Sequence, residues 1–453
     1  MQWYKIFIPE LRELIEARSL KELGEFLRRF HPADIVDILR EFPATDRVLA
    51  FRLLDKEKIA GVFSLLELEE QEELLKQFTE QRVKEILLEM GPDDRAQFLE
   101  ELPADMVKRL LALLPAQEKE VTNLILNYPP GSAGRLITTE YVALSPEMTA
   151  QEAIDQVRRT GLDKETVYVC YVVDKTHKLV GVCSLRDIIL APPSKKIGEI
   201  MNPMVYHVKT TDDQELAAQV IQKYDILAVP VVDQEGRLVG IVTVDDVLDV
   251  VQAEVSEDMQ KMAAVARPEE GYFALSFSQS VPKRVTWLVI LLVIQTFTGN
   301  IIHLFEDTLN SMMILTYFIP LVISVGGNIS AQSSTVVIRG LATGDLKHPF
   351  WWNILKRELF MGALMGLILG LIAVARVMLW ADNIKVGLAV AASVIAIAFV
   401  GNLWGAFAPL LFRRLRIDPA VASAPLMATV MDITGLSIYF GVVVSVLHFT
   451  RVM

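Results

Sequence analysis

The sequence is poor in cysteine and has no secretory leader pattern. Only Cys170 and Cys183 occur in its 453 residues, and their spacing fits neither a disulfide framework nor a zinc site. Both are expected to be reduced thiols buried in a cytosolic domain. Charges interrupt the apolar residues of the opening stretch MQWYKIFIPELRELIEARSL, so no cleavable signal peptide is expected.

Acidic residues are scarce in the last third of the chain. Of 56 Asp and Glu residues, seven lie after residue 270, where 12 Lys and Arg residues lie. The part up to residue 270 therefore carries a net charge near −17 and the rest near +5. An acidic segment repels nucleic acid and attracts cations, so we expect no nucleic-acid partner.

Long apolar runs fill the basic part. Each is about 20 residues or more, which is enough to cross a lipid bilayer. The expected spans are 285–305, 312–341, 355–380, 384–412 and 420–450. The sequence therefore predicts an all-α transmembrane domain of five helices over residues 283–453.

Charges between these spans predict their orientation. Basic residues precede the first span and lie in alternate connections, whereas acids dominate the other connections. The basic set is Lys283, Arg284, Lys347, Lys356, Arg357, Arg413, Arg414 and Arg416, and the acidic set is Glu306, Asp307 and Asp382, with the single Lys385. We expect a multi-pass protein of the cell membrane (inner or plasma membrane) with a cytoplasmic N-terminus and the C-terminus outside.

Residues 32–127 repeat with a period near 24. Val36, Ile59, Val83 and Val107 begin matching apolar runs, and each unit holds two short segments with helical spacing. Units of this size bury their apolar faces by stacking into a solenoid. We expect an α-helical solenoid over residues 1–130.

A second duplication follows. YVVDKTHKLVGVCSLRDII recurs as VPVVDQEGRLVGIVTVDDVL, and its strand, turn, strand, helix unit resembles a tandem pair of CBS domains, with α/β domains expected at 131–198 and 199–250. In that family such a pair often dimerises and can hold an adenine nucleotide such as ATP. Ser184 with Asp187, and Thr243 with Asp246, occupy the ribose-binding positions. Helix N-capping by Ser184 and Thr243 explains the same residues equally well.

The segment VLDVVQAEVSEDMQKMAAVA is helical in pattern and too charged to enter lipid. We expect a connecting helix and linker over residues 251–282, placed to transmit a change from the soluble domains to the membrane domain.

One acid lies within the fifth span. Asp432 follows the apolar stretch DPAVASAPLMATVM, and a charge at that depth costs several kcal/mol unless it faces water, a partner or an ion. A functional site is therefore predicted at Asp432. Two structural alternatives are an ion pair with Arg376 and a protonated carboxyl group hydrogen-bonded to a neighbouring helix.

The second span adds neutral oxygens and flexible backbone at membrane depth, which suits a hydrated hard cation. The residues are Gly326, Gly327, Asn328 and Gln332, with Ser333 and Ser334. Small polar residues also hold membrane helices together, so packing is the alternative interpretation.

The domain order, with GGN-x-x-x-Q in the second span and P-A-x-x-S-x-P-[LI]-x-A-T-x-x-D in the fifth, resembles the MgtE family of magnesium channels over essentially the whole chain. Ser330 replaces a glycine of the family pattern, and Ala424 replaces a small polar residue or glycine before Pro425.

The resemblance implies a homodimer in the lipid bilayer. Asp432 from each subunit would hold hydrated Mg²⁺ on the central axis, with the backbone carbonyl of Ala428 one turn earlier and with Ala424 and Pro425 along the pore. Mg²⁺ keeps most of its waters and contacts few carboxylates.

The resemblance also implies negative feedback by cytosolic Mg²⁺ and a role in magnesium homeostasis. Carboxylates at the domain junctions would bind Mg²⁺ and hold the pore closed. The matching positions are Asp94, Asp213, Glu215, Asp225, Asp246, Asp249, Glu254, Glu257 and Asp258.

Two other classes of protein are compatible with the domain order. A proton-coupled divalent-cation (Mg²⁺, Co²⁺ or Mn²⁺) transporter would use Asp432 to exchange a proton for the metal. A membrane enzyme such as an intramembrane protease would need a second membrane aspartate or a His-Glu-x-x-His motif, and neither is present. We therefore expect no enzyme activity. The family resemblance implies a channel, and the coupled transporter stays open as the alternative.

Overall fold

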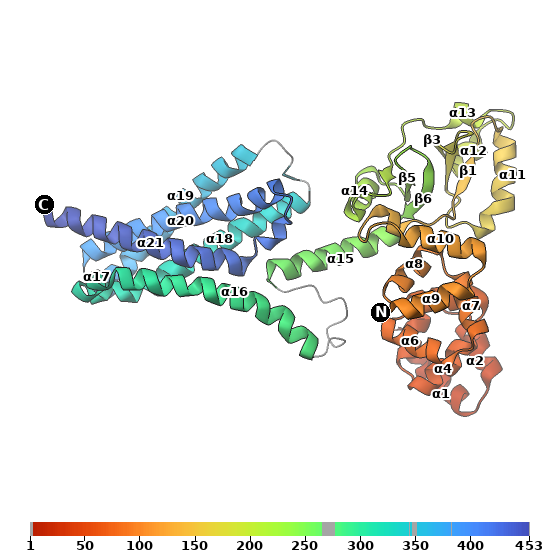
Figure 1. The fold of residues 1–453 in the computed structure, drawn as a ribbon, viewed down its shortest axis with the longest axis horizontal. Helices are drawn as coiled ribbons and strands as arrows, with labels where there is room; N and C mark the ends of the chain where they lie inside the picture. The colour runs from red at the N-terminus through yellow and green to blue at the C-terminus, as the bar shows by residue number, and fades with distance from the viewer. Residues whose placement is uncertain (1–2, 265–276, 344, 347–350, 382, 453) are drawn as a thin grey trace. The chain divides into compact units, whose positions relative to one another are not determined.

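A computed structural model describes residues 3–264, 277–343, 345–346, 351–381 and 383–452. The chain divides into two compact units, Met1–Gln252 and Ala253–Met453. Figure 1 shows the elements of both units.

The first unit begins with short helices, coloured red to orange in Figure 1. After the 3₁₀ turn Trp3–Phe7, they are α1 (Ile8–Glu16), α2 (Leu20–Leu27), α3 (Pro32–Arg40), α4 (Ala44–Arg52), α5 (Lys56–Ser64), α6 (Leu68–Gln77), α7 (Glu80–Glu89), α8 (Pro92–Glu100), α9 (Ala104–Leu113) and α10 (Ala116–Leu126). Proline lies at the start of six of them, in the first turn of α1, α3 and α8 and at the N-cap of α4, α9 and α10. Proline can begin a helix but cannot continue one, which explains why the helices are short.

The period of the sequence repeat matches every second helix. Val36, Ile59, Val83 and Val107 lie in α3, α5, α7 and α9, and each of these helices contacts the next one in that series. Val36, Ile59 and Val83 are buried in one apolar core that runs through the helical region. The predicted helical repeat is confirmed.

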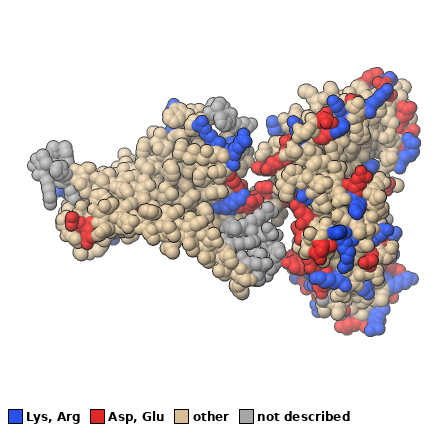
Figure 2. Space-filling view, in the orientation of Figure 1, with Lys and Arg blue, Asp and Glu red and all other residues tan. Residues whose placement is uncertain are grey.

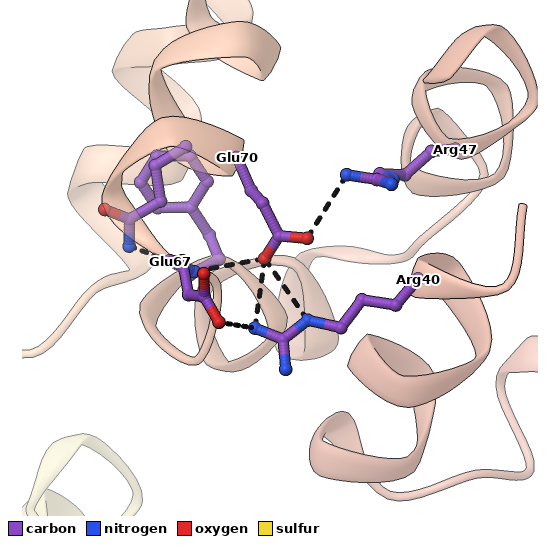
Figure 3. Close-up of polar contacts among 6 residues, drawn as sticks. Arg40, Arg47, Glu67 and Glu70 are labelled. Atoms are coloured by element: carbon purple, nitrogen blue, oxygen red, sulfur yellow. Dashed lines mark hydrogen bonds and ion pairs between the residues drawn. The ribbon is translucent and has the colours of Figure 1, made fainter. Parts of the chain in front are cut away.

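Charged side chains also connect successive repeats. Glu70 on α6 accepts hydrogen bonds from Arg40 on α3, at 3.1 Å from Nη2, and from Arg47 on α4, at 3.2 Å from Nη1 (Figure 3). Glu67 accepts a further bond from Arg40. These pairs lie near solvent, where an ion pair contributes 1 kcal/mol or less as an order of magnitude, so the apolar core carries most of the stability.

Arg95 on α8 is the largest fully buried side chain of the described residues. Its guanidinium donates to Thr122 Oγ1 at 2.9 Å, to the Leu87 carbonyl at 2.9 Å and to Glu118 Oε2 at 2.6 Å. Thr122 and Glu118 belong to α10 and Leu87 to α7, so this one side chain fixes three helices.

Two three-stranded sheets follow, each with a parallel and an antiparallel pair. The first contains β1 (Val142–Leu144), β2 (Val169–Val173) and β3 (Leu179–Ser184), and the second β4 (Val208–Lys209), β5 (Ala228–Val232) and β6 (Leu238–Thr243). Their helices are α11 (Ala150–Thr160), α12 (Leu185–Leu190), α13 (Ile197–Ile200) and α14 (Gln214–Tyr224).

The two hairpins correspond residue by residue. Asp174 and Asp233 accept backbone N–H groups in equivalent turns, and His177 and Gly236 occupy the same turn position with φ of 67° and 80°. The sheets meet through Tyr171, Ala228 and Ile241. The predicted CBS pair is confirmed in its architecture, and Cys170 and Cys183 are buried and unpaired by a disulfide.

Helix α15 (Val244–Met262) is continuous. It starts directly after β6, so it includes the expected domain boundary at residue 250 and the division between the two compact units after Gln252. The last helix of the second CBS domain and the expected connecting helix are therefore one element.

The second unit contains long apolar helices, which Figure 2 shows with few charged residues along their length. They are α16 (Phe277–Leu304), α18 (Ile319–Ala342), α19 (Trp351–Ala381), α20 (Ile384–Arg414) and α21 (Ala424–Val452), with the short α17 (Glu306–Ser311) after α16. Five segments of the described residues are long and apolar enough to cross a membrane: 284–304, 313–342, 351–380, 384–414 and 424–446. The five-helix prediction is confirmed by length and composition. Of the charges used to predict orientation, Lys347, Asp382 and the side chain of Lys283 lie outside the described residues.

Close packing in this unit depends on glycine. A Cβ atom at Gly362, Gly366 or Gly370 of α19 would lie within about 3 Å of atoms of α20, so a glycine stripe lets these two helices approach closely. Such small-residue contacts are the usual means of helix association in membranes.

We predict that Arg95→Ala lowers the free energy of unfolding of the first unit by about 3 kcal/mol, because it removes three buried hydrogen bonds and leaves a cavity. Urea denaturation of residues 1–252 measures this. The exposed Arg109 on α9 supplies the control, since Arg109→Ala should change stability by less than about 0.5 kcal/mol. Equal effects of the two substitutions would contradict the bridging role of Arg95.

Candidate functional sites

Asp432 lies in the third turn of α21. It is eight residues beyond the first residue of the helix, about 12 Å along the axis, and its side chain is half-buried. Its Oδ2 atom accepts a hydrogen bond of 2.9 Å from Nε2 of Gln295 on α16. Gln295 was missed in the sequence, where a lone glutamine in an apolar span gives no sign of its partner.

The ion pair with Arg376 is not formed. The Arg376 guanidinium lies 5.3 Å from the centre of the Trp380 ring on its own helix. The bond from Gln295 does match the other alternative, a carboxyl group hydrogen-bonded to a neighbouring helix. An amide N–H is a suitable donor to either protonation state of a carboxyl group, so this bond leaves an ion-binding role open to Asp432.

Pro425, Ala428 and Asp432 are spaced three and four residues apart and therefore lie along one face of α21. All three are partly accessible, as is Ala424, the first residue of the helix. Pro425 is the second residue of the helix, where its missing N–H has no intrahelical partner to lose. The structure thus places the four residues predicted from the fifth span on a continuous, partly open surface that includes Asp432.

The residues predicted from the second span divide into two groups on α18. Asn328 and Gln332 are exposed and one turn apart, whereas Gly326 and Gly327 are buried. A Cβ atom at Gly327 would lie 3.3 Å from the Ala428 Cβ, and one at Gly326 would lie 3.0 Å from Ile397. The glycines bring α18 against α21 and α20, while the amide side chains form a polar stripe on a helix of membrane length.

The serines of α18 act as contacts between helices. Ser334 Oγ donates to the Ala422 carbonyl at 2.7 Å, and Ser330 Oγ donates to the Gly327 carbonyl at 3.1 Å. Both serines are buried. The packing interpretation holds for them, because the hydroxyl of Ser330, which replaces a family glycine, also lies 3.4 Å from the Met427 carbonyl of α21.

Glu358 on α19 makes a further partly buried carboxylate contact that sequence reasoning missed. Its Oε2 accepts from Asn402 Nδ2 on α20 at 2.9 Å and lies 3.1 Å from Ser333 Oγ on α18. It therefore links α18, α19 and α20 near the end of α19 that follows the basic connection.

Carboxylates gather in the first unit where the solenoid meets the CBS pair. The charges of Asp245 and Asp249 on α15 act on the carboxyl group of Asp94 on α8. The charge of Asp94 acts in the same way on Asp246. Asp93 and Glu165 join the same group. Of these, Asp94, Asp246 and Asp249 were predicted together, and Asp93, Glu165 and Asp245 were missed because nothing local distinguishes them from surface acids.

Burial, followed by repulsion from neighbouring carboxylates, raises the pKa values of Asp93, Asp94, Glu165 and Asp246. Burial, followed by the charges of Asp245 and Asp246, raises the pKa of Glu165 to about 7. Burial also raises the pKa of Asp246 to about 6, although the Thr243 hydroxyl opposes the shift. The pKa of Asp93 is raised well above its usual value by burial and by Asp246. Like charges held this close favour either a proton or a cation.

Asp213 and Glu215 lie together at the start of α14, and Asp225 lies at its end. Asp213 caps the start of the helix by accepting the Glu215 N–H at 2.9 Å, and Asp225 caps its end with φ of 49°. The two ends are about 18 Å apart, so Asp225 and Asp213 belong to different sites.

Ser184 makes the capping contact that was the alternative to ribose binding, and Thr243 bonds the carboxylate three residues on. Ser184 Oγ lies 2.6 Å from Asp187 Oδ2 and accepts the Asp187 N–H at 3.0 Å. Thr243 Oγ1 lies 2.6 Å from Asp246 Oδ2. These bonds hold the two Ser/Thr-Asp pairs in equivalent geometry at the starts of α12 and α15.

In the second unit, the end of α15 contacts the turn before α21. Lys261 Nζ lies 2.7 Å from Glu257 Oε1 and 2.5 Å from Asp418 Oδ2, and Met262 packs near Ala420, Ala422 and Met427. Burial lowers the pKa of Lys261, but its hydrogen bonds to Asp418 and Glu257 outweigh burial and the pKa is raised. The sequence did not single out Asp418, because an aspartate before a proline is an ordinary cap of a helical turn. Asp418 also makes that capping contact.

Asp258 lies beside the same contact. Burial, with the charge of Asp418, raises its pKa. Glu254 lies one turn before it on α15 and influences it electrostatically. Within the part of the chain that the structure describes, no group of three His, Cys, Asp or Glu side chains is arranged to hold a metal ion.

Comparison with known families identifies the class of protein. Residues 319–442 match a family of divalent cation transporters, residues 30–131 match the MgtE intracellular N domain, and residues 133–194 and 197–253 match CBS domains. The chain is 42% identical over 95% of its length to the magnesium transporter MgtE of Thermus thermophilus, covering 96% of that protein. It is 33% identical to the Bacillus subtilis magnesium transporter MgtE, with 98% of each chain covered. The chain belongs to the MgtE family.

Solved structures agree for the soluble part. The cytosolic domain of the Mg²⁺ channel MgtE in complex with ATP is 43% identical, with a TM-score of 0.52, and the match covers 54% of this chain and 99% of that one. The soluble part of a magnesium transporter matches at 31% identity with the same TM-score, over 55% of this chain and 98% of that one.

The raised pKa values of the cluster predict how stability depends on pH. Glu165 and Asp246 bind protons more tightly in the folded chain than in the unfolded one, so their contribution is largest at low pH and is lost as pH rises through about 6 to 7. Residues 1–252, without divalent ions, should therefore lose about 1 kcal/mol of stability between pH 5.5 and 7.5, allowing for solvent screening.

Denaturation with urea at the two pH values measures the loss. The doubly substituted Glu165→Gln and Asp246→Asn chain is the control, because neither replacement titrates. An equal pH dependence in the control and the unchanged chain would contradict the assignment.

Proposed function

We propose that this chain is a Mg²⁺ channel of the cell membrane that works as a homodimer and closes when cytosolic Mg²⁺ is high. One observation carries the proposal: Asp432 is a half-buried carboxylate within an apolar helix of membrane length, and it lies on the same accessible face as Ala428 and Pro425. A charge so placed is costly unless it serves an ion or a water-filled path.

The chemistry of the face suits hydrated Mg²⁺. The ion requires six oxygen ligands near octahedral geometry and gives up water reluctantly. One carboxylate per chain, with backbone carbonyls of α21 and the neutral side chains of Asn328 and Gln332, offers oxygens without demanding dehydration. The relatives named as magnesium transporters support Mg²⁺ as the transported ion.

Two copies of the chain would complete the site. A single Asp432 supplies too few contacts for an octahedral ion, whereas two related by a twofold axis surround it. Large apolar side chains on the CBS pair are exposed in one chain and suit an isologous contact. They are Ile189, Leu190, Met204 and Leu227.

Regulation follows from the acidic cluster. Unneutralised carboxylates at Asp94, Asp246 and Asp249 repel, and Mg²⁺ bound among them would draw α8 and α15 together. The continuous helix α15 extends from this cluster to Lys261 and Asp418, and Asp418 precedes the helix that carries Asp432. Glu254, Glu257 and Asp258 lie on the same stretch, and Asp213, Glu215 and Asp225 form separate candidate sites on α14.

A nucleotide site at the CBS pair is a further part of the proposal. A related cytosolic domain has been solved in complex with ATP, and Asp187 and Asp246 carry the carboxylates that suit ribose hydroxyls. ATP would act here as a regulator, because ion conduction requires no catalytic nucleophile or base.

The N-terminus is proposed to be cytoplasmic. Among the described residues, Arg357, Arg413 and Arg414 lie at helix ends that the basic-side rule places on the cytoplasmic face. An odd number of spans then places the C-terminus outside.

We predict that Asp432→Asn abolishes Mg²⁺ uptake into proteoliposomes, reducing it at least tenfold, because the isosteric amide removes the charge and keeps the shape. Ser437→Ala is the matched control on α21, since the exposed Ser437 hydroxyl donates only to the Ile433 carbonyl of its own helix in the described contacts. Undiminished uptake by a folded Asp432→Asn protein would place the path elsewhere.

We further predict that the double substitution Asp94→Asn and Asp246→Asn raises the cytosolic Mg²⁺ concentration needed for half-closure by about tenfold, because each lost carboxylate removes about 1 kcal/mol or less of binding near water and more where buried. Patch-clamp recording with Mg²⁺ varied on the cytosolic side measures this. Asp105→Asn, on the exposed first turn of α9, is the control. Unchanged half-closure in the double variant would contradict a regulatory role for the cluster.

A further inference from the structure

We propose that Gln295 is a positioning residue that makes the Asp432 site select Mg²⁺ over Ca²⁺. The inference rests on the proposed function of Asp432 and assigns the residue that controls how that carboxylate meets an ion.

Gln295 lies near the middle of the first span, 11 residues after Arg284 and nine before Leu304. The ten residues before it, VTWLVILLVI, contain no charge. A polar amide at this depth is unfavourable without a hydrogen-bond partner. Its observed partner is Asp432, 137 positions further along the chain, at 2.9 Å.

The bond involves one particular oxygen. Nε2 of Gln295 donates to Oδ2, so Oδ2 has a fixed partner and the carboxylate has lost freedom to rotate. Oδ1 accepts no hydrogen bond among the described contacts, so it is the oxygen left for an ion. Asp432 is therefore prepared for contact through one oxygen.

One-oxygen contact favours Mg²⁺. Ca²⁺ takes six to eight ligands in flexible geometry and commonly binds both oxygens of a carboxylate, whereas Mg²⁺ keeps several waters and contacts carboxylates sparingly. Holding Oδ2 on an amide opposes the two-oxygen geometry that suits Ca²⁺ and leaves room for the water shell of Mg²⁺. Without the amide, the carboxylate is free to turn and bind Ca²⁺ through both oxygens.

The test is the ratio of Ca²⁺ to Mg²⁺ uptake into proteoliposomes that contain the full chain. Gln295→Met keeps the side-chain length and removes the donor, so we expect the ratio of Ca²⁺ to Mg²⁺ uptake to rise at least fivefold. Gln295→Glu replaces the donor with a second carboxylate of the same shape, and we expect it to raise the ratio further. Having two variants keeps the test decisive if one of them does not fold.

Thr296→Val is the matched control. Thr296 follows Gln295 on α16 and donates to the Val293 carbonyl of the same helix, so its loss should leave the ratio unchanged. An unchanged ratio in both folded Gln295 variants, or an equal rise in Thr296→Val, would overturn the inference. Uptake that survives Asp432→Asn would instead refute the pore at Asp432, so the two failures are distinguishable.

Discussion

The carboxylate of Asp432 is the constraint on which the membrane domain depends. A charge within a span costs several kcal/mol when it is unpaired, and the surrounding helices are arranged to reduce that cost. Gln295 reaches it from α16, and Gly327 lets α18 approach Ala428 one turn away. The neighbouring helices in turn are fixed by buried polar contacts, including Glu358 with Asn402 and Ser333.

In the soluble domains, by contrast with the single Asp432, several carboxylates lie close together. The described contacts of this cluster include no lysine or arginine. The pKa values of Asp93, Asp94, Glu165 and Asp246 are all raised, first by burial and then by neighbouring carboxylates. Ionisation of these crowded carboxylates is unfavourable, so a cation that neutralises their charge stabilises the cluster. In the proposed mechanism that response passes along α15, whose last turn is tied by Lys261 to Asp418 at the start of the segment leading into α21.

Sequence reasoning predicted the elements whose signals are local. The period near 24 identified the alternate helices marked by Val36, Ile59 and Val83, and the duplicated Val-Val-Asp pattern identified two equivalent hairpins. It also predicted Asp432, because an acid in an apolar run is conspicuous. It missed Gln295, Asp418 and Glu358, whose roles arise from partners brought together only by folding, and it could not tell that Gly326 is buried while Asn328 is exposed on the same helix.

The same limit explains the mixed outcome for the regulatory acids. Asp94 and Asp246 come together, although more than 100 positions separate them, but Asp213 and Asp225 lie at opposite ends of α14. Charge patterning indicated that an acidic junction exists, and the fold determines which acids share it. The family resemblance indicated which acids are candidates, but it gave no information on the distances between them.

The reversal potential of the purified protein in a planar bilayer tests the central claim most directly, with a Mg²⁺ gradient and a proton gradient imposed independently. A channel predicts a current that reverses at the Mg²⁺ equilibrium potential whatever the proton gradient. A reversal potential that moves with the proton gradient at fixed Mg²⁺ would contradict the channel and indicate proton-coupled transport.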